Sequence, residues 1–267
     1  MTAGASPVGP KRGMPKVDLD ATRDRLLKLG LTHAAEQLEA KVTVAVKESL
    51  SPHQFLDAVL EIELAEREER RIRTSMKLSG LPTGQTLANF DFAFQPSVER
   101  SRIETLGTCA WIRESHNLLL QGPPGVGKTH LAVSLGIRAV ENGFGVIFYR
   151  LEDLLAALKV DADLSPTRLR RRKYMNVSLL IIDEVGFEPM SRVEASLFFR
   201  LVSYRYGRGS ILITTNKGIR DWPEVLAGDE VLATAILDRL LHKSHVLNIR
   251  GRSYRLRELE ERSESRP

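Results

Sequence analysis

Residues 118–129 read LLLQGPPGVGKT, an apolar run followed directly by a glycine-rich loop. The loop matches the pattern G-x-x-x-x-G-K-[ST], and the amphipathic segment HLAVSLGIRAVENG follows it, which is the context that this motif requires. Glycines in such a loop let successive backbone N–H groups converge on phosphates, and the helix after it presents its positive N-terminal end to the same anions. The sequence therefore predicts a phosphate-binding loop between a strand and a helix.

The chemistry of this loop predicts an ATP site with a magnesium ion. Lys128 is expected to reach the β- and γ-phosphates. Thr129 is expected to offer its hydroxyl to Mg²⁺, which prefers oxygen ligands and keeps much of its water. The predicted nucleotide contacts from this region are Gly122, Pro123, Pro124, Gly125, Val126, Gly127, Lys128, Thr129 and His130.

A second motif lies about 54 residues further on, where the apolar run 179–183 ends in Asp183 and Glu184. In a parallel sheet these two side chains emerge beside the phosphate-binding loop. Asp183 is expected to hold Mg²⁺ through water, and Glu184 to orient and deprotonate an attacking water, because phosphoryl transfer relies mainly on positioning and charge stabilisation. A carboxylate pair at a strand end is otherwise an ordinary turn.

A third polar position follows the next apolar run, 210–214, at Asn216. An Asn there is expected to sense the γ-phosphate or hold the attacking water, the alternative being a turn-forming side chain. The letters NKGIRD resemble the guanine-reading motif N-K-x-D of GTPases. Asp221 stands five positions after Asn216, which is the wrong spacing, so the sequence favours ATP.

Five short apolar runs alternate with amphipathic segments after residue 101. Runs of this kind suit strands that helices cover on both faces, so the sequence predicts an α/β fold with a mostly parallel sheet. The runs lie at 118–121, 146–149, 179–183, 210–214 and 245–249.

The remaining sequence predicts a helical N-terminal domain and the boundaries between domains. The clearest helix start is at Ser51, where Pro52 fills the first helical position and Gln54 completes a capping box. The charged continuation of this helix is interpreted as a solvated face, although its basic end, with Arg70, Arg71, Arg73 and Lys77, could touch phosphate. The predicted parts are a disordered tail at 1–19, a small all-helical domain at 20–80, a linker with exposed aromatics at 81–100, the ATPase domain at 101–258 and a disordered tail at 259–267.

Composition narrows the class of protein. The chain has 267 residues and a net charge of +5, which permits a polyanionic partner without demanding one. Its one cysteine, Cys109, cannot form an internal disulfide and fits a reducing compartment. Without an apolar stretch of roughly 18 residues, no membrane span is expected. We therefore expect a cytoplasmic protein with no membrane partner.

The densest positive charge follows Ser165 and Pro166, which are expected to start a helix. Phosphate contacts by such residues would give affinity for DNA without base specificity and with a steep salt dependence. The alternative is a solvated helix whose arginines pair with carboxylates. The predicted DNA-binding residues are Arg168, Arg170, Arg171, Arg172 and Lys173.

The three motifs taken together resemble the AAA+ ATPases. The phrases LLIIDEVGFEPM, SILITTNKGIRDWPEVL and ATAILDRLLHKSHVLNIRGRSYR are similar to the IstB family, ATP-binding helper proteins of insertion-sequence transposition related to the helicase loader DnaC. The resemblance covers roughly Leu26 to Glu258. The last phrase is its most specific part, whereas a phosphate-binding loop alone identifies only a very large superfamily.

The resemblance implies roles for further residues. Arg239, in ILDRL, matches the arginine finger that such proteins insert into a neighbouring subunit's ATP site. Arg255, in SYR, matches a second sensor that contacts nucleotide within its own subunit. Surface salt bridges are the alternative for both arginines. Phe90 and Phe92 are implied to lie near the adenine, or equally to pack in the core. Related initiator proteins also turn helices like the basic one toward DNA.

The resemblance implies a transposition helper that forms a homo-oligomer through composite ATP sites on duplex DNA, hydrolyses ATP and delivers target DNA to a transposase. The first alternative is a DnaC-like replicative helicase loader. Two others are a small-molecule kinase, against which the Asp-Glu pair argues, and a DNA-binding scaffold without hydrolysis, against which Glu184 and Arg239 argue.

Overall fold

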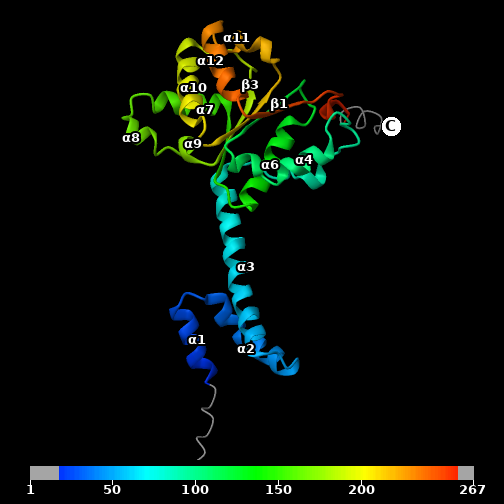
Figure 1. Cartoon of the computed structure of the whole chain (residues 1–267), viewed down its shortest axis with the longest axis vertical. Coiled ribbons are helices and arrows are strands. Elements are labelled where there is room, and N and C mark those ends of the chain that lie inside the picture. The colour runs from blue at the N-terminus through cyan, green and yellow to red at the C-terminus, as the bar shows by residue number, and fades with distance from the viewer. Residues whose placement is uncertain (1–17, 258–267) are drawn as a thin grey trace, which may run out of the picture. The chain divides into compact units, whose positions relative to one another are not determined.

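The computed structural model describes residues 18–257, which form two compact units that divide at Arg71 and Ile72 (Figure 1). The tails expected at 1–19 and 259–267 lie outside the described residues, apart from the helix start at Asp18 and Leu19.

The first unit contains helices α1 (Leu19–Lys28) and α2 (Thr32–Lys47) and the first part of α3 (Pro52–Ser79). The start of α3 confirms the predicted capping box. The Ser51 N–H donates to Gln54 Oε1 over 2.8 Å, and the Gln54 N–H donates to Ser51 Oγ over 3.3 Å. Within residues 18–257 no helix, including the 28-residue α3, is apolar enough to cross a membrane.

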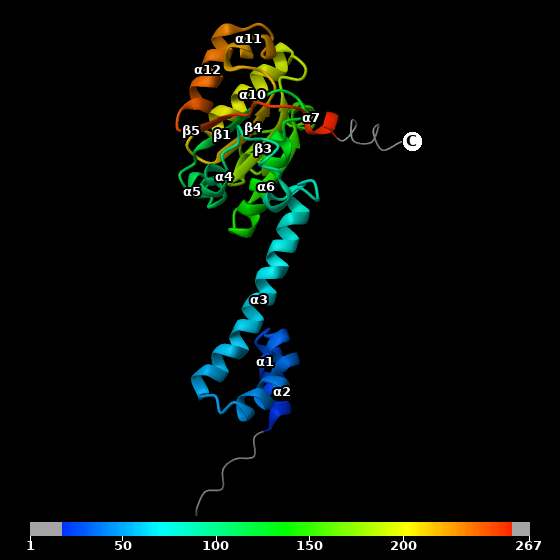
Figure 2. The ribbon, with the colours of Figure 1, turned by 90° about the vertical axis from the view of Figure 1, so that its right-hand side faces the viewer.

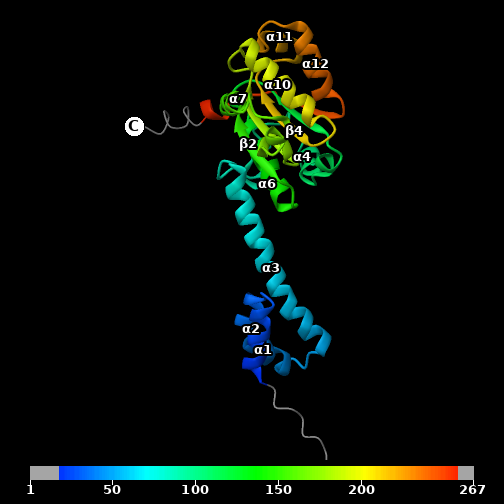
Figure 3. The ribbon, with the colours of Figure 1, turned by 90° about the vertical axis from the view of Figure 1, so that its left-hand side faces the viewer.

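The second unit is built on a five-stranded sheet, and every strand pair in it is parallel, as the sequence predicts. The strand order is β2-β3-β4-β1-β5, so β2 and β5 are the edges; β5 is labelled in Figure 2 and β2 in Figure 3. The strands are β1 (Asn117–Gln121), β2 (Val146–Arg150), β3 (Leu179–Val185), β4 (Ser210–Thr215) and β5 (Ser244–Asn248).

Helices bury both faces of this sheet, which explains why its strands are apolar on both sides. Successive residues of β3 alternate between two cores: Leu179 and Ile181 belong to one, Leu180 and Ile182 to the other. The first core includes α4 (Arg100–Gly107), α5 (Ala110–Arg113) and α6 (Lys128–Glu141). The second includes α7 (Leu151–Val160), α10 (Arg192–Arg205), α11 (Trp222–Val225) and α12 (Glu230–Leu241). A 3-10 turn, η2 (Ile219–Asp221), precedes α11.

The segment 81–100 differs from the expected linker with exposed aromatics. It belongs to the second unit and contains a 3-10 turn, η1 (Leu87–Asn89). Leu81, Phe90 and Val98 are buried in the same core as the apolar residues of α6, and Phe90 is only 8% exposed. Burial of these apolar side chains explains why the segment packs on the second unit instead of forming an exposed linker.

The basic segment, residues 168–173, also differs from the prediction, because it forms no continuous helix. Helix α8 (Pro166–Leu169) ends after one turn, and α9 (Lys173–Asn176) begins only after Arg172, whose backbone is extended at φ −68° and ψ 140°. The physical reason is a tertiary contact, since Arg172 turns to pair with Asp161 at the end of α7.

Candidate nucleotide-binding site

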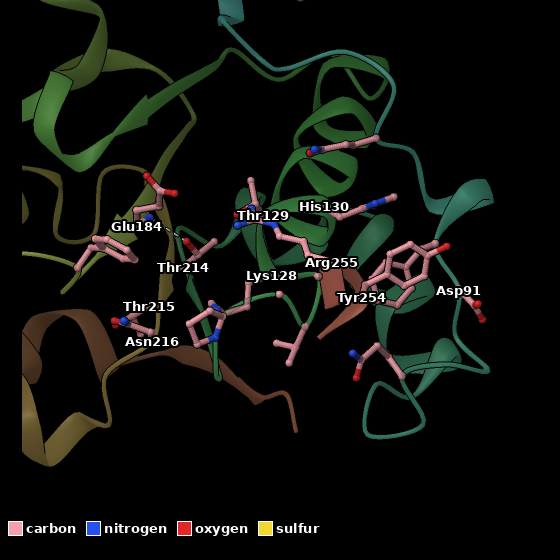
Figure 4. A pocket seen from close by; sticks show the side chains of 18 of the residues that line it. Asp91, Lys128, Thr129, His130, Glu184, Thr214, Thr215, Asn216, Tyr254 and Arg255 are labelled. Atoms are coloured by element: carbon pink, nitrogen blue, oxygen red, sulfur yellow. Dashed lines mark hydrogen bonds between the residues drawn. The ribbon is translucent and has the colours of Figure 1, made fainter. Parts of the chain in front are cut away.

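A cavity of about 370 Å³ opens where β3 and β4 end beside the start of α6 (Figure 4). Ligands of open parallel sheets commonly bind at the carboxyl ends of the strands, which is where this cavity lies. The predicted residues among its lining are Phe90, Pro124, Gly125, Val126, Gly127, Lys128, Thr129, His130, Glu184, Asn216 and Arg255. Gln85, Asn89, Asp91, Gln95, Phe187, Thr214, Thr215 and Tyr254 also line it and were not predicted.

Lys128 lies inside the phosphate-binding loop. Its Nζ donates to the carbonyl oxygens of Gly122 at 2.8 Å and of Pro123 at 2.7 Å. Gly122 and Pro123 were predicted to contact the nucleotide, and in the structure both accept hydrogen bonds from Lys128. Burial lowers the pKa of the Lys128 ammonium; Asp183 opposes this effect and Arg255 adds to it. An anion entering the loop would therefore meet a cation that is partly stripped of water.

Two glycines allow other segments to pack directly on this loop. Gly127 has φ +91°, and a Cβ placed on it would lie 2.7 Å from the Phe90 ring. Gly125 has φ +80°, and a Cβ there would collide with Ser253. The neighbouring Tyr254 N–H donates to the Gly125 carbonyl over 2.9 Å. The packing of Phe90 and of residues 253–254 on this loop therefore requires glycine at both positions.

A chain of hydrogen bonds joins the loop to the acidic pair. Thr129 Oγ1 donates to Asp183 Oδ1 over 3.0 Å, and Thr214 Oγ1 donates to the same oxygen over 2.5 Å. The Thr214 hydroxyl also accepts the Glu184 N–H over 3.0 Å. Asp183 is 3% exposed, so these donors hold its carboxylate at a fixed place. Thr214, which was not predicted, therefore connects the two acidic residues.

Glu184 differs from Asp183 in its backbone conformation and in the exposure of its side chain. Its φ of +64° is a left-handed value that costs a non-glycine residue about 1–3 kcal/mol and recurs at functional sites. The register between β3 and β4 shifts at this point, which turns the Glu184 side chain out of the core. The Glu184 side chain is 48% exposed beside the cavity, and Arg150 Nε at the end of β2 lies 4.0 Å from its carboxylate.

The opposite wall of the cavity comes from the segment after η1 and from the C-terminal segment (Figure 4). Phe90 packs edge-on against His130, with ring centroids 5.3 Å apart. The Phe94 N–H holds the pKa of Asp91 below its usual range; burial opposes this effect, and the Arg257 guanidinium at 3.2 Å supports it. Arg255 also lines the cavity, near enough to Lys128 to help lower the pKa of its ammonium.

Arg239 and the basic segment do not line this cavity. Arg239, on α12, donates to the Ala235 carbonyl over 2.7 Å, and its guanidinium lies 5.0 Å from the centre of the Phe199 ring. The predicted DNA-binding residues follow α7 and are exposed: Arg168, Arg170, Arg171, Arg172 and Lys173.

Comparison with known families identifies the chain. The model of IstB-like ATP binding proteins matches residues 24–262. This chain belongs to that family. The IstB-like chain is 44% identical over 233 residues to a protein from Pseudomonas aeruginosa named as an ATP-binding protein of insertion sequence IS21, covering 87% of this chain and 88% of the relative. It is 40% identical to a counterpart of insertion sequence IS5376 from Geobacillus stearothermophilus, covering 86% and 92%. Binding of ATP follows from this membership.

Solved structures confirm the AAA+ fold of the IstB-like chain. The DnaC helicase loader is 26% identical with a TM-score of 0.51, over 62% of this chain and 97% of the loader. DnaA from Aquifex aeolicus bound to AMPPCP is 19% identical with a TM-score of 0.52, over 69% and 56%, and shows likeness of fold alone.

Proposed function

We propose that the IstB-like chain hydrolyses ATP at this cavity. The observation that carries the proposal is the bonded chain from Thr129 through Asp183 and Thr214 to Glu184, which holds one carboxylate fixed and leaves the next exposed at the cavity. Glu184 would orient and deprotonate the attacking water, and Lys128 would bind the β- and γ-phosphates. Asn216, at the end of β4, would sense the γ-phosphate.

The same residues fit a magnesium ion. The Thr129 hydroxyl and the Asp183 carboxylate, 3.0 Å apart, are oxygen donors of the kind that Mg²⁺ prefers. Residues 18–257 contain no cluster of three or more His, Cys, Asp or Glu that could hold a metal ion. This agrees with Mg²⁺ binding through a single carboxylate together with substrate phosphates. When bound, the ion would neutralise charge on the phosphates.

The test is phosphate release from ATP by the full chain, with and without duplex DNA, compared with Glu184→Gln. General-base catalysis contributes roughly 10²–10⁴-fold, so we expect turnover to fall by at least about 100-fold while ATP binding stays unchanged. Turnover at the normal rate in this variant would remove Glu184 from the mechanism. Phosphate release without an added acceptor would exclude a small-molecule kinase.

We further propose that ATP-bound copies assemble on duplex DNA and deliver target DNA to a transposase. Support comes from the relatives, which are named as ATP-binding proteins of insertion sequences, and from the exposed cations at 168–173. Arg239 would complete the ATP site of a neighbouring copy, and Phe90 and Arg255 would contact the nucleotide of their own copy.

A helicase-loading role is the second candidate, because the DnaC loader shares the fold over 97% of its length. Binding of the purified chain to the transposase encoded in the same insertion sequence, measured beside binding to the replicative helicase of the host, separates the two. Binding to the helicase alone would overturn the transposition role.

A further inference from the structure

The basic segment is part of a loop, residues 161–173, that runs from the end of α7 to the start of α9. We propose that buried Asp161 positions this loop for DNA binding, and that Arg172 belongs to its internal support and is not a DNA contact. This inference rests on the proposed DNA binding and adds the residues that shape the contact surface.

Asp161 binds Arg172 near the far end of the loop and Tyr174 in α9. The residue ends α7 and is 4% exposed. Its Oδ2 accepts the Tyr174 hydroxyl over 2.6 Å, and its Oδ1 accepts Arg172 Nη2 over 2.5 Å. A buried carboxylate is costly unless it is paired and hydrogen-bonded, so the contacts with Arg172 and Tyr174 offset the cost of burying Asp161.

A second buried charge anchors α9 to the sheet. Arg205, on α10, is 1% exposed, and its guanidinium donates only to backbone carbonyl oxygens among the bonds seen in residues 18–257. Three of these acceptors lie in or just after α9, and the fourth begins β4: Tyr174, Met175, Val177 and Ser210. The loop is therefore fastened to α7 through Asp161 and to α10 and β4 through Arg205.

The other cations of the loop differ from Arg172 in their surroundings. Within residues 18–257, Arg172 is the member of the basic segment that forms an ion pair. Asn176 Nδ2 donates to the Arg170 carbonyl and so supports the turn before α9. The cations that stay exposed without an ion pair in this part of the chain are Arg168, Arg170, Arg171 and Lys173. Four exposed positive charges on this fastened loop suit contacts with the phosphates of a DNA strand.

The deciding variant is Asp161→Asn, because a pure charge effect and a loss of loop support predict opposite changes in its affinity for DNA. It removes one negative charge beside the basic segment, so charge alone would strengthen DNA binding. Asn keeps one acceptor oxygen and replaces the other with an NH₂ donor, so it cannot accept from both Arg172 and Tyr174. Losing one of these two bonds would release the loop, and we expect an affinity for duplex DNA lower by about threefold or more, the order of one lost phosphate contact. Asp163→Asn is the matched control, since Asp163 is an exposed carboxylate of the same loop. We expect its binding to be unchanged or slightly tighter.

The measurement is fluorescence anisotropy of a labelled duplex against full-length chain with ATP, over a series of salt concentrations. Tyr174→Phe keeps the charge and removes one bond to Asp161, so we expect weaker binding there too. Arg171→Gln should make the negative slope of log affinity against log salt shallower by about 0.9, because one phosphate contact is lost. Arg172→Gln placed in the Asp161→Asn background should cause no further loss, because both changes break the same support.

ATP binding by each variant checks that the ATPase fold is intact. A wild-type chain that binds no duplex DNA would overturn the proposed function itself. A wild-type chain that binds DNA, together with Asp161→Asn and Tyr174→Phe variants that bind as tightly or more tightly, would overturn the positioning role alone.

Discussion

Thr214 shows how one hydroxyl can serve two carboxylate residues. It donates to Asp183 and accepts the N–H of Glu184, so it fixes the buried acid and the strained backbone of the exposed one. We expect Thr214→Val to lower ATP turnover by roughly 10–100-fold, the usual cost of losing a group that orients a catalytic or metal-binding residue. ATP binding should change much less. Single-turnover phosphate release and equilibrium ATP binding measure the two effects separately.

Thr214→Ser is the control, because it retains the hydroxyl and should keep most of the turnover. Wild-type turnover in Thr214→Val would show that the hydrogen bonds of the Thr214 hydroxyl do not support catalysis. Asp183 and Glu184 could be predicted from an apolar run that ends in two acids. Thr214 could not, because its role depends on the pairing of β3 with β4, which brings residues 31 positions apart into contact.

At the scale of helices, Glu63 of α3 caps the N-terminus of α2. Its Oε2 accepts the N–H groups of His33 and Ala34 at 3.0 and 3.3 Å, where Leu31 offers no capping side chain. Arg67 completes the contact, since its guanidinium donates to Glu63 Oε1 and to the Gly30 carbonyl. Helix N-termini favour a negative charge, so this one side chain joins α3 to the turn between α1 and α2.

We expect Glu63→Gln to speed amide hydrogen exchange in the first turn of α2 by several-fold. Burial would raise the pKa of Glu63, but the Ala34 N–H, Arg67 and the His33 N–H outweigh it and leave the pKa lowered. A lowered pKa stabilises the fold above the unfolded pKa, and this contribution is lost as the pH falls through the folded value. Exchange in wild type should therefore approach that of the variant in acid. Equal protection in both at pH 7 would contradict the capping role.

Elements differ in how far local sequence determines them. The five strands were predicted because their residues are apolar on both faces whatever surrounds them. The α3 start was predicted because Ser51 and Gln54 bond each other within one turn. The break between α8 and α9 depends on Asp161, eleven residues before Arg172, and the packing of 81–100 depends on α6. Such contacts leave no periodic pattern in the sequence.

At the scale of the whole molecule, the candidate nucleotide cavity and Arg239 lie on separate parts of the chain's surface. Lys128, Glu184 and Asn216 line the cavity, whereas Arg239 lies on α12 outside it. A guanidinium that acts from a neighbouring copy is worth roughly 10³–10⁵-fold in phosphoryl transfer. If copies share their sites, each active site needs Lys128 from one chain and Arg239 from another.

Mixing two inactive variants tests this sharing. Lys128→Ala should be unable to use its own ATP site, and Arg239→Ala should be unable to complete the site of its neighbour; alone, each is expected to lose at least about 1,000-fold in turnover. Mixed in the presence of duplex DNA, they should regain a fraction of wild-type ATPase activity, because some interfaces pair the intact cavity of one variant with the intact Arg239 of the other. Recovery should depend on total protein concentration, since it requires association. A mixture as inactive as its components, under conditions where wild type assembles and turns over, would show that Arg239 does not act in trans.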